Sequence, residues 1–154
     1  MNRGFLMRVS RGRPFVTLKL AVSIDGAIAM HSGESQWITG SAARADVQRL
    51  RAESAAILTG IGTVIDDAPS LTQALGERDI NTLLVECGPR LAGNLLDADL
   101  VDELVIYQAP HMMGSETRRM ARTPGWQQLS DRLDLEIVDR RQVGRDTRIT
   151  ARIS

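Results

Sequence analysis

Two pairs of glycines beside predicted strands carry the clearest chemical signal in the sequence. Gly88 and Gly93 frame the start of a predicted helix, directly after the apolar run of residues 82–86. The N-terminus of a helix presents unpaired N–H groups and a partial positive charge, and both attract phosphate. The spacing matches neither a Walker loop nor a GxGxxG loop, so ordinary helix capping explains it equally well.

The second pair, Gly60 and Gly62, follows the apolar run of residues 55–58 and has Thr63 beside it. Ligands of open α/β sheets bind beyond the carboxyl ends of the strands. We therefore expect both glycine pairs to lie in one crevice, which favours a nucleotide site without specifying the nucleotide.

Two acidic residues and two histidines have the side chains that metal and proton-transfer sites use. Asp66 and Asp67 could form a general acid–base pair or bind a metal, but a solvated turn before Pro69 is the simpler interpretation. His31 and His111 have neither HExxH spacing nor cysteine neighbours. The sequence therefore predicts no metal site.

A serine, a cysteine and three arginines complete the candidates. Ser35 lacks the G-x-S-x-G elbow of a hydrolytic nucleophile. Cys87 lies near a predicted helix start, which could lower the pKa of its thiol, although a small buried residue is the simplest interpretation. Arg44, Arg49 and Arg51 lie on one predicted helix and could clamp a substrate phosphate or form a solvated helix face.

The composition is that of one small globular domain. The 154 residues are 43% hydrophobic and 25% charged, which excludes disorder and a collagen-like chain. A net charge of zero and 3% aromatic residues argue against a nucleic-acid partner. One cysteine excludes an internal disulfide, and no apolar run approaches the ~18 residues of a membrane helix. We expect a soluble, cytoplasmic domain without a signal peptide.

An α/β arrangement must position these residues. Apolar alternation and apolar runs predict strands, and they are residues 15–23, 55–58, 82–86 and 104–109, followed by an antiparallel hairpin of residues 133–143 and 147–153. Helices are predicted after a cap at Thr39 or Ser41 and over residues 90–98. The remaining segments are expected to be an N-terminal arm or linker remnant (residues 1–13), a loop (27–35) and a turn (64–72).

Nine short strings, taken together, resemble one protein family. They are residues 18–21, 23–26, 33–39, 48–52, 57–64, 67–72, 85–89, 100–104 and 110–114. In this order they resemble the reductase domain of the bacterial bifunctional riboflavin-biosynthesis deaminase–reductase. The resemblance covers nearly the whole chain from Pro14 onward, so residues 14–154 are interpreted as a reductase-like domain.

The resemblance implies a dihydrofolate-reductase-like fold: an α/β protein with a mixed sheet, flanking helices and a C-terminal antiparallel hairpin, truncated in the middle. It also implies NADPH-dependent reduction of 5-amino-6-(5-phosphoribosylamino)uracil, whose ribosyl group becomes a ribityl chain. The hydride comes from the cofactor, so no side chain is assigned a redox role, and only Asp67 could contribute to catalysis.

Family positions that contact cofactor or substrate carry over to this sequence residue by residue. The implied cofactor-binding residues are Ala21, Trp37, Thr63, Asp67, Gly88, Pro89, Arg90, Leu91, Ala92, Gly93 and Asn94. The implied substrate-binding residues are Ser35, Arg51, Leu71 and Glu86.

The sequence departs from the family between Thr72 and Thr82. Only nine residues stand where the family has several tens, and Gln73-Ala74 occupy the place of a substrate-binding arginine. The zinc deaminase half has no counterpart in the sequence. The chain could therefore be an active shortened reductase, a fragment that has lost its middle, or a non-catalytic oligomeric remnant that binds a nucleotide or a partner. A sheet without its centre would expose apolar edges, so we expect a homodimer or a rearranged sheet.

Overall fold

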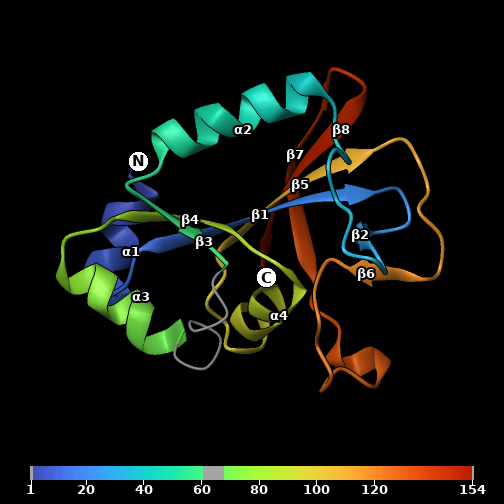
Figure 1. The fold of residues 1–154 in the computed structure, drawn as a ribbon. Coiled ribbons are helices and arrows are strands. Elements are labelled where there is room, and N and C mark those ends of the chain that lie inside the picture. The colour runs from blue at the N-terminus through green and yellow to red at the C-terminus, as the bar shows by residue number, and fades with distance from the viewer. Residues whose placement is uncertain (1, 61–67, 154) are drawn as a thin grey trace.

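The computed structural model describes residues 2–60 and 68–153, and its main feature is a six-stranded mixed sheet (Figure 1). The strands lie in the order β3-β4-β1-β5-β8-β7, and β2 pairs with β6 in a separate small sheet. The strands are β1 (Phe15–Ser23), β2 (Ala27–Met30), β3 (Ala56–Thr59), β4 (Thr82–Glu86), β5 (Glu103–Ala109), β6 (Thr117–Arg119), β7 (Leu135–Val143) and β8 (Asp146–Ile153). The helices are α1 (Arg3–Arg11), α2 (Ser41–Glu53), α3 (Ala68–Glu77), α4 (Pro89–Asp97) and the 3-10 turn η1 (Leu129–Asp131).

Strand β1 lies in the middle of the sheet because one of its faces is entirely apolar. Val16, Leu18, Leu20 and Val22 are buried, whereas the alternate residues from Phe15 to Ala21 are only half-buried. β1 pairs in parallel with β4 and β5, and β8 adds to β5 and to β7 in antiparallel directions. The predicted mixed sheet and C-terminal hairpin are therefore confirmed.

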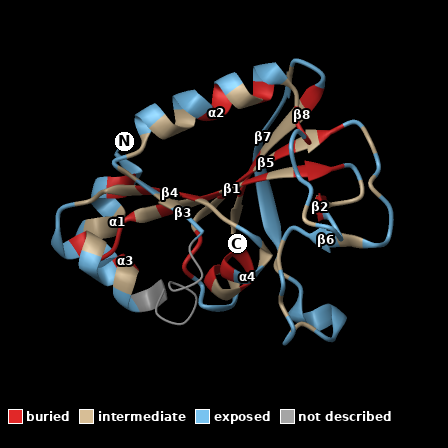
Figure 2. Cartoon of the chain, viewed as in Figure 1, coloured by how far each residue is buried: buried red, intermediate tan, exposed pale blue. Residues whose placement is uncertain are grey.

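Helices cover the two faces of the sheet in different ways. The buried face of α4, with Leu91, Ala92 and Leu95, packs against the apolar face of β1. On the opposite face, Ala43 and Val47 of α2 pack against β5. Figures 1 and 2 show α2 and α4 on opposite sides of the largely buried central strands. The half-buried residues of β1 therefore face the side on which α2 lies.

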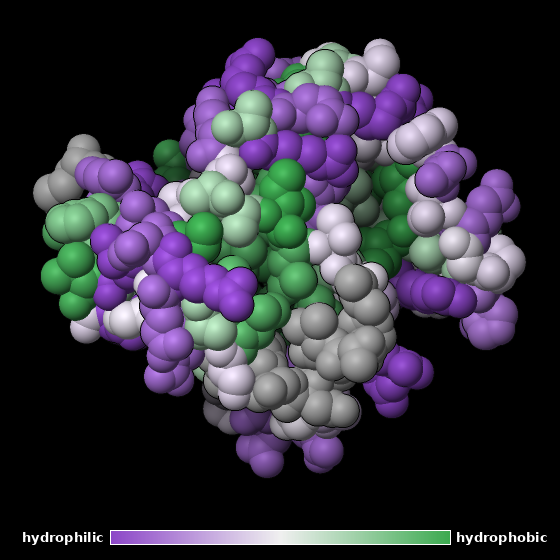
Figure 3. Space-filling view, turned by 60° about the vertical axis from the view of Figure 1, so that its left-hand side comes forward, coloured by the Kyte–Doolittle hydropathy of each residue, from purple (hydrophilic) through white to green (hydrophobic). Residues whose placement is uncertain are grey.

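The N-terminal segment differs from the predicted arm, because residues 3–11 form helix α1. Asn2 caps its first turn, and Gly12 ends it in the left-handed conformation at φ 67. The sequence prediction missed these two boundary signals. Figure 3, which brings the side with α1, α3 and β3 forward, shows apolar surface on that side. Exposed apolar residues of α1 and β3 include Phe5, Val9 and Ile57.

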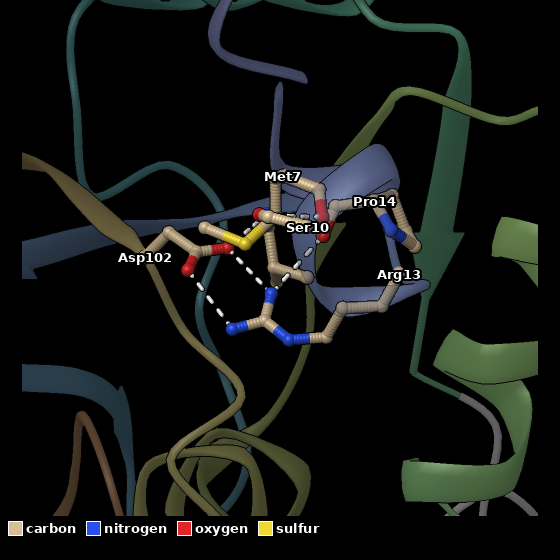
Figure 4. Close-up of polar contacts among 6 residues, drawn as sticks. Met7, Ser10, Arg13, Pro14 and Asp102 are labelled. Carbon is tan, nitrogen blue, oxygen red and sulfur yellow. Dashed lines mark hydrogen bonds and ion pairs between the residues drawn. The ribbon is translucent and has the colours of Figure 1, made fainter. Parts of the chain in front are cut away.

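An ion pair fastens the segment after α1 to the start of β5 (Figure 4). The Arg13 guanidinium donates to both carboxylate oxygens of Asp102 at 2.7 and 3.0 Å, and both side chains are only 10% exposed. Asp102 also accepts from the backbone N–H of Val16 at 2.7 Å. Residues 2–13 are thus packed against the sheet, while the division of the chain at residue 13 stays a prediction.

Two further segments have more regular structure than predicted. Strand β2 occupies the first half of the predicted loop at residues 27–35, and α3 begins within the predicted turn at residues 64–72. Pro69 is the second residue of α3, a position where proline suits a helix. Helix α2 begins after Gly40, so neither Thr39 nor Ser41 is its cap.

The short connection before β4 leaves the sheet intact. The sequence predicts a homodimer or a rearranged sheet because of the missing stretch; in the structure β1 lies in the middle of the sheet, and the two edges are β3 and β7. Only residues 78–81 join α3 to β4, with Asp79 at φ 61. Arg8 of α1 binds this connection by donating to Asp79 at 2.6 Å and to Asn81 at 2.9 Å. Among the described residues, no helix is long and apolar enough to cross a membrane.

Candidate active site

A cleft of about 1150 Å³ opens between helix α2 and the central strands. Residues of β1 form its floor, and the loop of residues 33–39 and helix α2 form its walls. The ends of β3 and β4 and the start of α4 close it at one side, and Arg118 of β6 lines it at another. The carboxyl ends of the parallel strands β3 and β4 thus meet at the cleft beside the middle of β1, and open α/β sheets bind ligands beyond the carboxyl ends of their strands.

Seven of the fifteen residues that the family resemblance implies for cofactor or substrate binding line this cleft. They are Ala21, Ser35, Trp37, Arg51, Glu86, Gly88 and Pro89. Gly60 joins them, and its N–H donates to the Glu86 carbonyl at 3.2 Å. The predicted meeting of the Gly60 and Gly88 turns in one crevice is therefore confirmed, whereas Thr63, Asp66 and Asp67 lie outside the described residues.

The rest of the predicted phosphate loop does not line the cleft. Leu91 and Ala92 are buried in the core under the sheet. Gly93 is also buried, and the Arg122 backbone lies so close that a side chain at this position would overlap its carbonyl. Arg90 is exposed outside the cleft, and Asn94 lies one turn further along α4. A cofactor role for these residues stays a prediction, and so does a substrate role for Leu71, which lies on α3 outside the cleft lining.

Glu86 is the only carboxylate among the described residues that line the cleft, and two cations hold it. Arg51 donates to both of its oxygens at 2.6 and 3.0 Å, and the Lys19 ammonium lies 3.4 Å from Oε2. Burial alone would raise the pKa of Glu86, but the Arg51 hydrogen bonds and the two positive charges outweigh it and lower the pKa. Glu86 is therefore an anion at neutral pH that fixes Arg51 and Lys19 in the cleft.

The start of α4 presents open backbone to the cleft. Gly88 is the N-cap, no side chain caps the helix, and a side chain added at Gly88 would meet no atom within 4 Å. Free N–H groups at a helix N-terminus suit an anionic ligand. The neighbouring Cys87 behaves differently from the suggested reactive thiol, because burial raises its pKa to about 12.

A buried polar cluster fixes α2 above the cleft. Asp46 of α2 accepts from the Tyr107 hydroxyl at 2.7 Å and from Arg148 at 2.8 Å. Burial would raise the pKa of Asp46, but these hydrogen bonds and the nearby arginine charges lower it. The charged cluster holds α2 against β5 and β8, so the arginines on the cleft side of α2 keep a defined position.

Three cations in the cleft are not among the residues that the family resemblance assigns to cofactor or substrate, although Arg44 was considered from the sequence as a possible phosphate clamp. Lys19 is the only lysine in the sequence, and its position opposite the apolar face of β1 was the signal that could have found it. Arg44 stacks on the Trp37 ring at 4.6 Å and donates to the Thr39 carbonyl at 2.8 Å. Arg118 comes from β6, a strand that the sequence analysis did not predict.

The described cleft residues include four cations and one carboxylate, although the whole chain has zero net charge. The cations are Lys19, Arg44, Arg51 and Arg118, and the carboxylate is Glu86. Such a concentration of positive charge attracts phosphorylated ligands. No group of three metal-binding side chains lies together in the described parts of the chain.

Comparison with known proteins points to one family. The RibD C-terminal domain family matches the chain in two segments, residues 14–78 and 73–149. The riboflavin biosynthesis protein RibD of Haemophilus influenzae is 33% identical over 228 residues, covering 97% of this chain and 61% of the relative. The chain thus spans about three fifths of that relative's length. The alignment is 74 positions longer than the 154 residues of the chain, so at least 74 positions of the relative have no counterpart in this chain.

Solved structures agree on the fold. Acinetobacter baumannii RibD (form 1) matches with a TM-score of 0.89 at 30% identity, covering 99% of this chain and 62% of that chain. Dihydrofolate reductase from Enterococcus faecalis, complexed with NADP(H), matches with a TM-score of 0.54 at 11% identity, covering 91% of this chain and 96% of that chain. The fold is therefore dihydrofolate-reductase-like, as the sequence motifs implied. Since the family match extends from residue 14 to residue 149, in two segments that overlap at residues 73–78, the chain belongs to the RibD C-terminal domain family.

Proposed function

We propose that this chain is an oxidoreductase that uses NADPH to reduce 5-amino-6-(5-phosphoribosylamino)uracil to its ribitylamino product in riboflavin biosynthesis. The observation that carries the proposal is the cleft, in which the open N-terminus of α4 and the Lys19–Glu86–Arg51 group lie together. The substrate identity rests on the family resemblance. The reaction takes place in the cytoplasm in this proposal.

The cleft fits a nicotinamide dinucleotide, which supplies a hydride when it is bound. The backbone N–H groups around the start of α4, other than that of Pro89, suit the pyrophosphate because no side chain caps the helix and the space beside Gly88 is open. Ala21 and Trp37 lie in the same cleft and would contact the nicotinamide end. NADP(H) bound to the dihydrofolate reductase that shares the fold supports this class of cofactor.

The Lys19–Glu86–Arg51 group suits the proton transfer that the reduction requires. Hydride addition to C1′ of the ribosyl group breaks the bond from C1′ to the ring oxygen, and that oxygen leaves with a proton. The Lys19 ammonium is the only lysine donor available and can supply the proton from Nζ. Glu86 holds the ammonium in place, and Ser35 and Arg51 would contact the substrate.

Cofactor binding tests the proposal most directly. Trp37 is exposed at the cleft, and the Trp126→Phe variant leaves it as the only tryptophan. We expect NADPH to quench the fluorescence of this variant and the chain to oxidise NADPH when the aminouracil ribosyl phosphate is added. Absence of quenching at millimolar NADPH would overturn the reductase proposal.

One observation favours a second candidate, a non-catalytic nucleotide- or partner-binding remnant. The alignment with the Haemophilus influenzae relative shows at least 74 positions without a counterpart in this chain. A chain that has lost this segment could keep the scaffold without turnover. This candidate predicts a stable oligomer without NADPH affinity, which sedimentation together with a thermal-shift titration would reveal.

A further inference from the structure

Two arginines in the cleft have no acidic partner among the described residues. Lys19 and Arg51 share the negative charge of Glu86, whereas Arg44 and Arg118 line the same cleft without an ion pair in the described chain. Arg44 uses one N–H for the Thr39 carbonyl and stacks on the Trp37 ring. Within the described residues, the side chain of Arg118 has no hydrogen bond or ion pair, although its backbone pairs with β2. Two guanidinium groups in one cleft thus keep free N–H donors.

Both arginines flank the same loop, residues 33–39. At its start, Gly33 has φ +95, and a side chain there would lie 3.3 Å from Nη2 of Arg118. The Arg118 guanidinium therefore lies over the loop where glycine leaves room. At the other end of the loop, Arg44 contacts Trp37 and Thr39. Ser35 lies between these two contacts in sequence and also lines the cleft.

We propose that Arg118 and Arg44, with the Ser35 hydroxyl, form a site that binds a phosphate group over the loop of residues 33–39. Planar guanidinium groups with free donors bind phosphate oxygens in pairs, and a hydroxyl adds a further donor. The loop's own carboxylate, Glu34, is exposed and does not line the cleft, so it leaves the two positive charges uncompensated.

The proposal rests on the proposed function in one respect, namely the source of the phosphate. The sugar phosphate of the substrate and the 2′-phosphate of NADPH carry the same phosphate monoester chemistry. Each source predicts a different dependence on Arg118. A sugar-phosphate site binds ribose 5-phosphate and not ribose, whereas a cofactor site discriminates NADPH from NADH.

Isothermal titration calorimetry of the whole chain with these four ligands tests the site. We expect Arg118→Gln to weaken binding of ribose 5-phosphate or of NADPH by about tenfold or more, the loss of charge-assisted hydrogen bonds. Binding of ribose and of NADH should not change. Arg44→Gln should weaken binding of the same phosphate ligand. Arg118→Lys should bind it more tightly than Arg118→Gln but less tightly than the wild type, because lysine lacks the planar pair of donors.

Arg11→Gln is the matched control, because it removes one exposed arginine on α1, outside the cleft. If Arg118→Gln and Arg11→Gln bind every ligand alike, or if the wild-type chain binds neither ribose 5-phosphate nor NADPH, the phosphate site is overturned. A phosphate affinity that depends on Arg118 in a chain without turnover would support the site and contradict only the reductase proposal. Turnover that does not change when Arg118 is substituted would support the reductase proposal and contradict the phosphate site.

Discussion

At the scale of single residues, the cleft depends on one carboxylate that orders two cations. Glu86 accepts two hydrogen bonds from Arg51 and lies 3.4 Å from the Lys19 ammonium. Neither cation has another acidic partner in the described cleft lining. Removing the Glu86 charge would leave two half-buried cations facing each other, whereas removing one cation would leave the other paired.

The pKa shift of Glu86 predicts a pH-dependent contribution to stability. Because its folded pKa lies below the ordinary value of 4.5, the stabilisation is fully present above about pH 4.5 and is lost as the pH falls through the folded pKa. We expect Glu86→Gln to melt at a lower temperature than the wild type at neutral pH. Thermal unfolding at decreasing pH should show this difference shrinking.

The exposed carboxylate Glu34 provides the control for this measurement. Glu34→Gln should have the same melting temperature as the wild type throughout the same pH range. A melting difference for Glu86→Gln that stays constant from neutral to acid pH would show that shape, and not charge, determines the effect.

Lys19 provides a separate test of proton transfer. Lys19→Arg keeps a positive charge beside Glu86, but arginine does not release a proton at accessible pH. We expect turnover of the aminouracil ribosyl phosphate to fall by about 10²-fold or more, the range for loss of a general acid, while NADPH affinity stays close to that of the wild type. Stopped-flow turnover and fluorescence titration separate the two effects, and an unimpaired Lys19→Arg chain would remove Lys19 from the proposed chemistry.

At the scale of elements, α4 combines two tasks in nine residues. Its first turn, beginning after Gly88, faces the cleft, whereas Leu91, Ala92 and Leu95 are buried under the sheet. The sequence motif was interpreted as one phosphate-binding loop through Asn94. The structure separates it into a ligand-facing end and a packing surface, because a helix turns its face away within one turn.

Gly93 tests this division. In an open helix, Gly→Ala would stabilise by up to about 1 kcal/mol, but here the added methyl would overlap the Arg122 carbonyl. We expect Gly93→Ala to destabilise the chain by about 1–3 kcal/mol in urea unfolding, the usual range for an overpacked core. Gly125→Ala, at which a methyl group meets no atom within 4 Å, is the control. Equal stability of the two variants would contradict the packing role.

Sequence patterns predicted the elements whose signals are local. β1 follows from the alternation of buried Val16 and Leu18 with half-buried neighbours, and β4 follows from its apolar run. β6 has only three residues and forms because β2 pairs with it, a contact between distant segments that no local pattern records. Arg118 was missed for the same reason. Ala21 and Glu86 were found only through the family resemblance, since an alanine and a strand-end glutamate carry no signal of their own.

At the scale of the whole molecule, the two edges of the sheet differ in how much apolar surface they expose. β3 is short and exposes Ile57, whereas eight of the nine residues of β7 are exposed and include Leu135, Ile137 and Val138. A long exposed edge with apolar side chains favours association with another strand. The sequence predicts a homodimer because of exposed edges. We therefore expect β7 to form the contact between the two copies.

Substitution at each edge tests which one associates. We expect the wild-type chain to sediment as a dimer and Ile137→Lys to sediment as a monomer, because a charge in the middle of β7 opposes pairing. Ile57→Lys places the same charge on the opposite edge and should leave the dimer intact. Dissociation by Ile57→Lys alone would assign the contact to β3, and a monomeric wild type would exclude the homodimer.

The four-residue connection between α3 and β4 is a place where the chain could accept an insertion. The ends of these two elements are at most about 18 Å apart, given about 3.6 Å per residue, and α1 holds the connection through Arg8 and Asn81. A lobe whose own termini lie close together could be grafted at this place, or exchanged between relatives, without altering the register of any strand. An insertion at this connection would therefore lie outside the sheet and leave the strands that line the cleft in place.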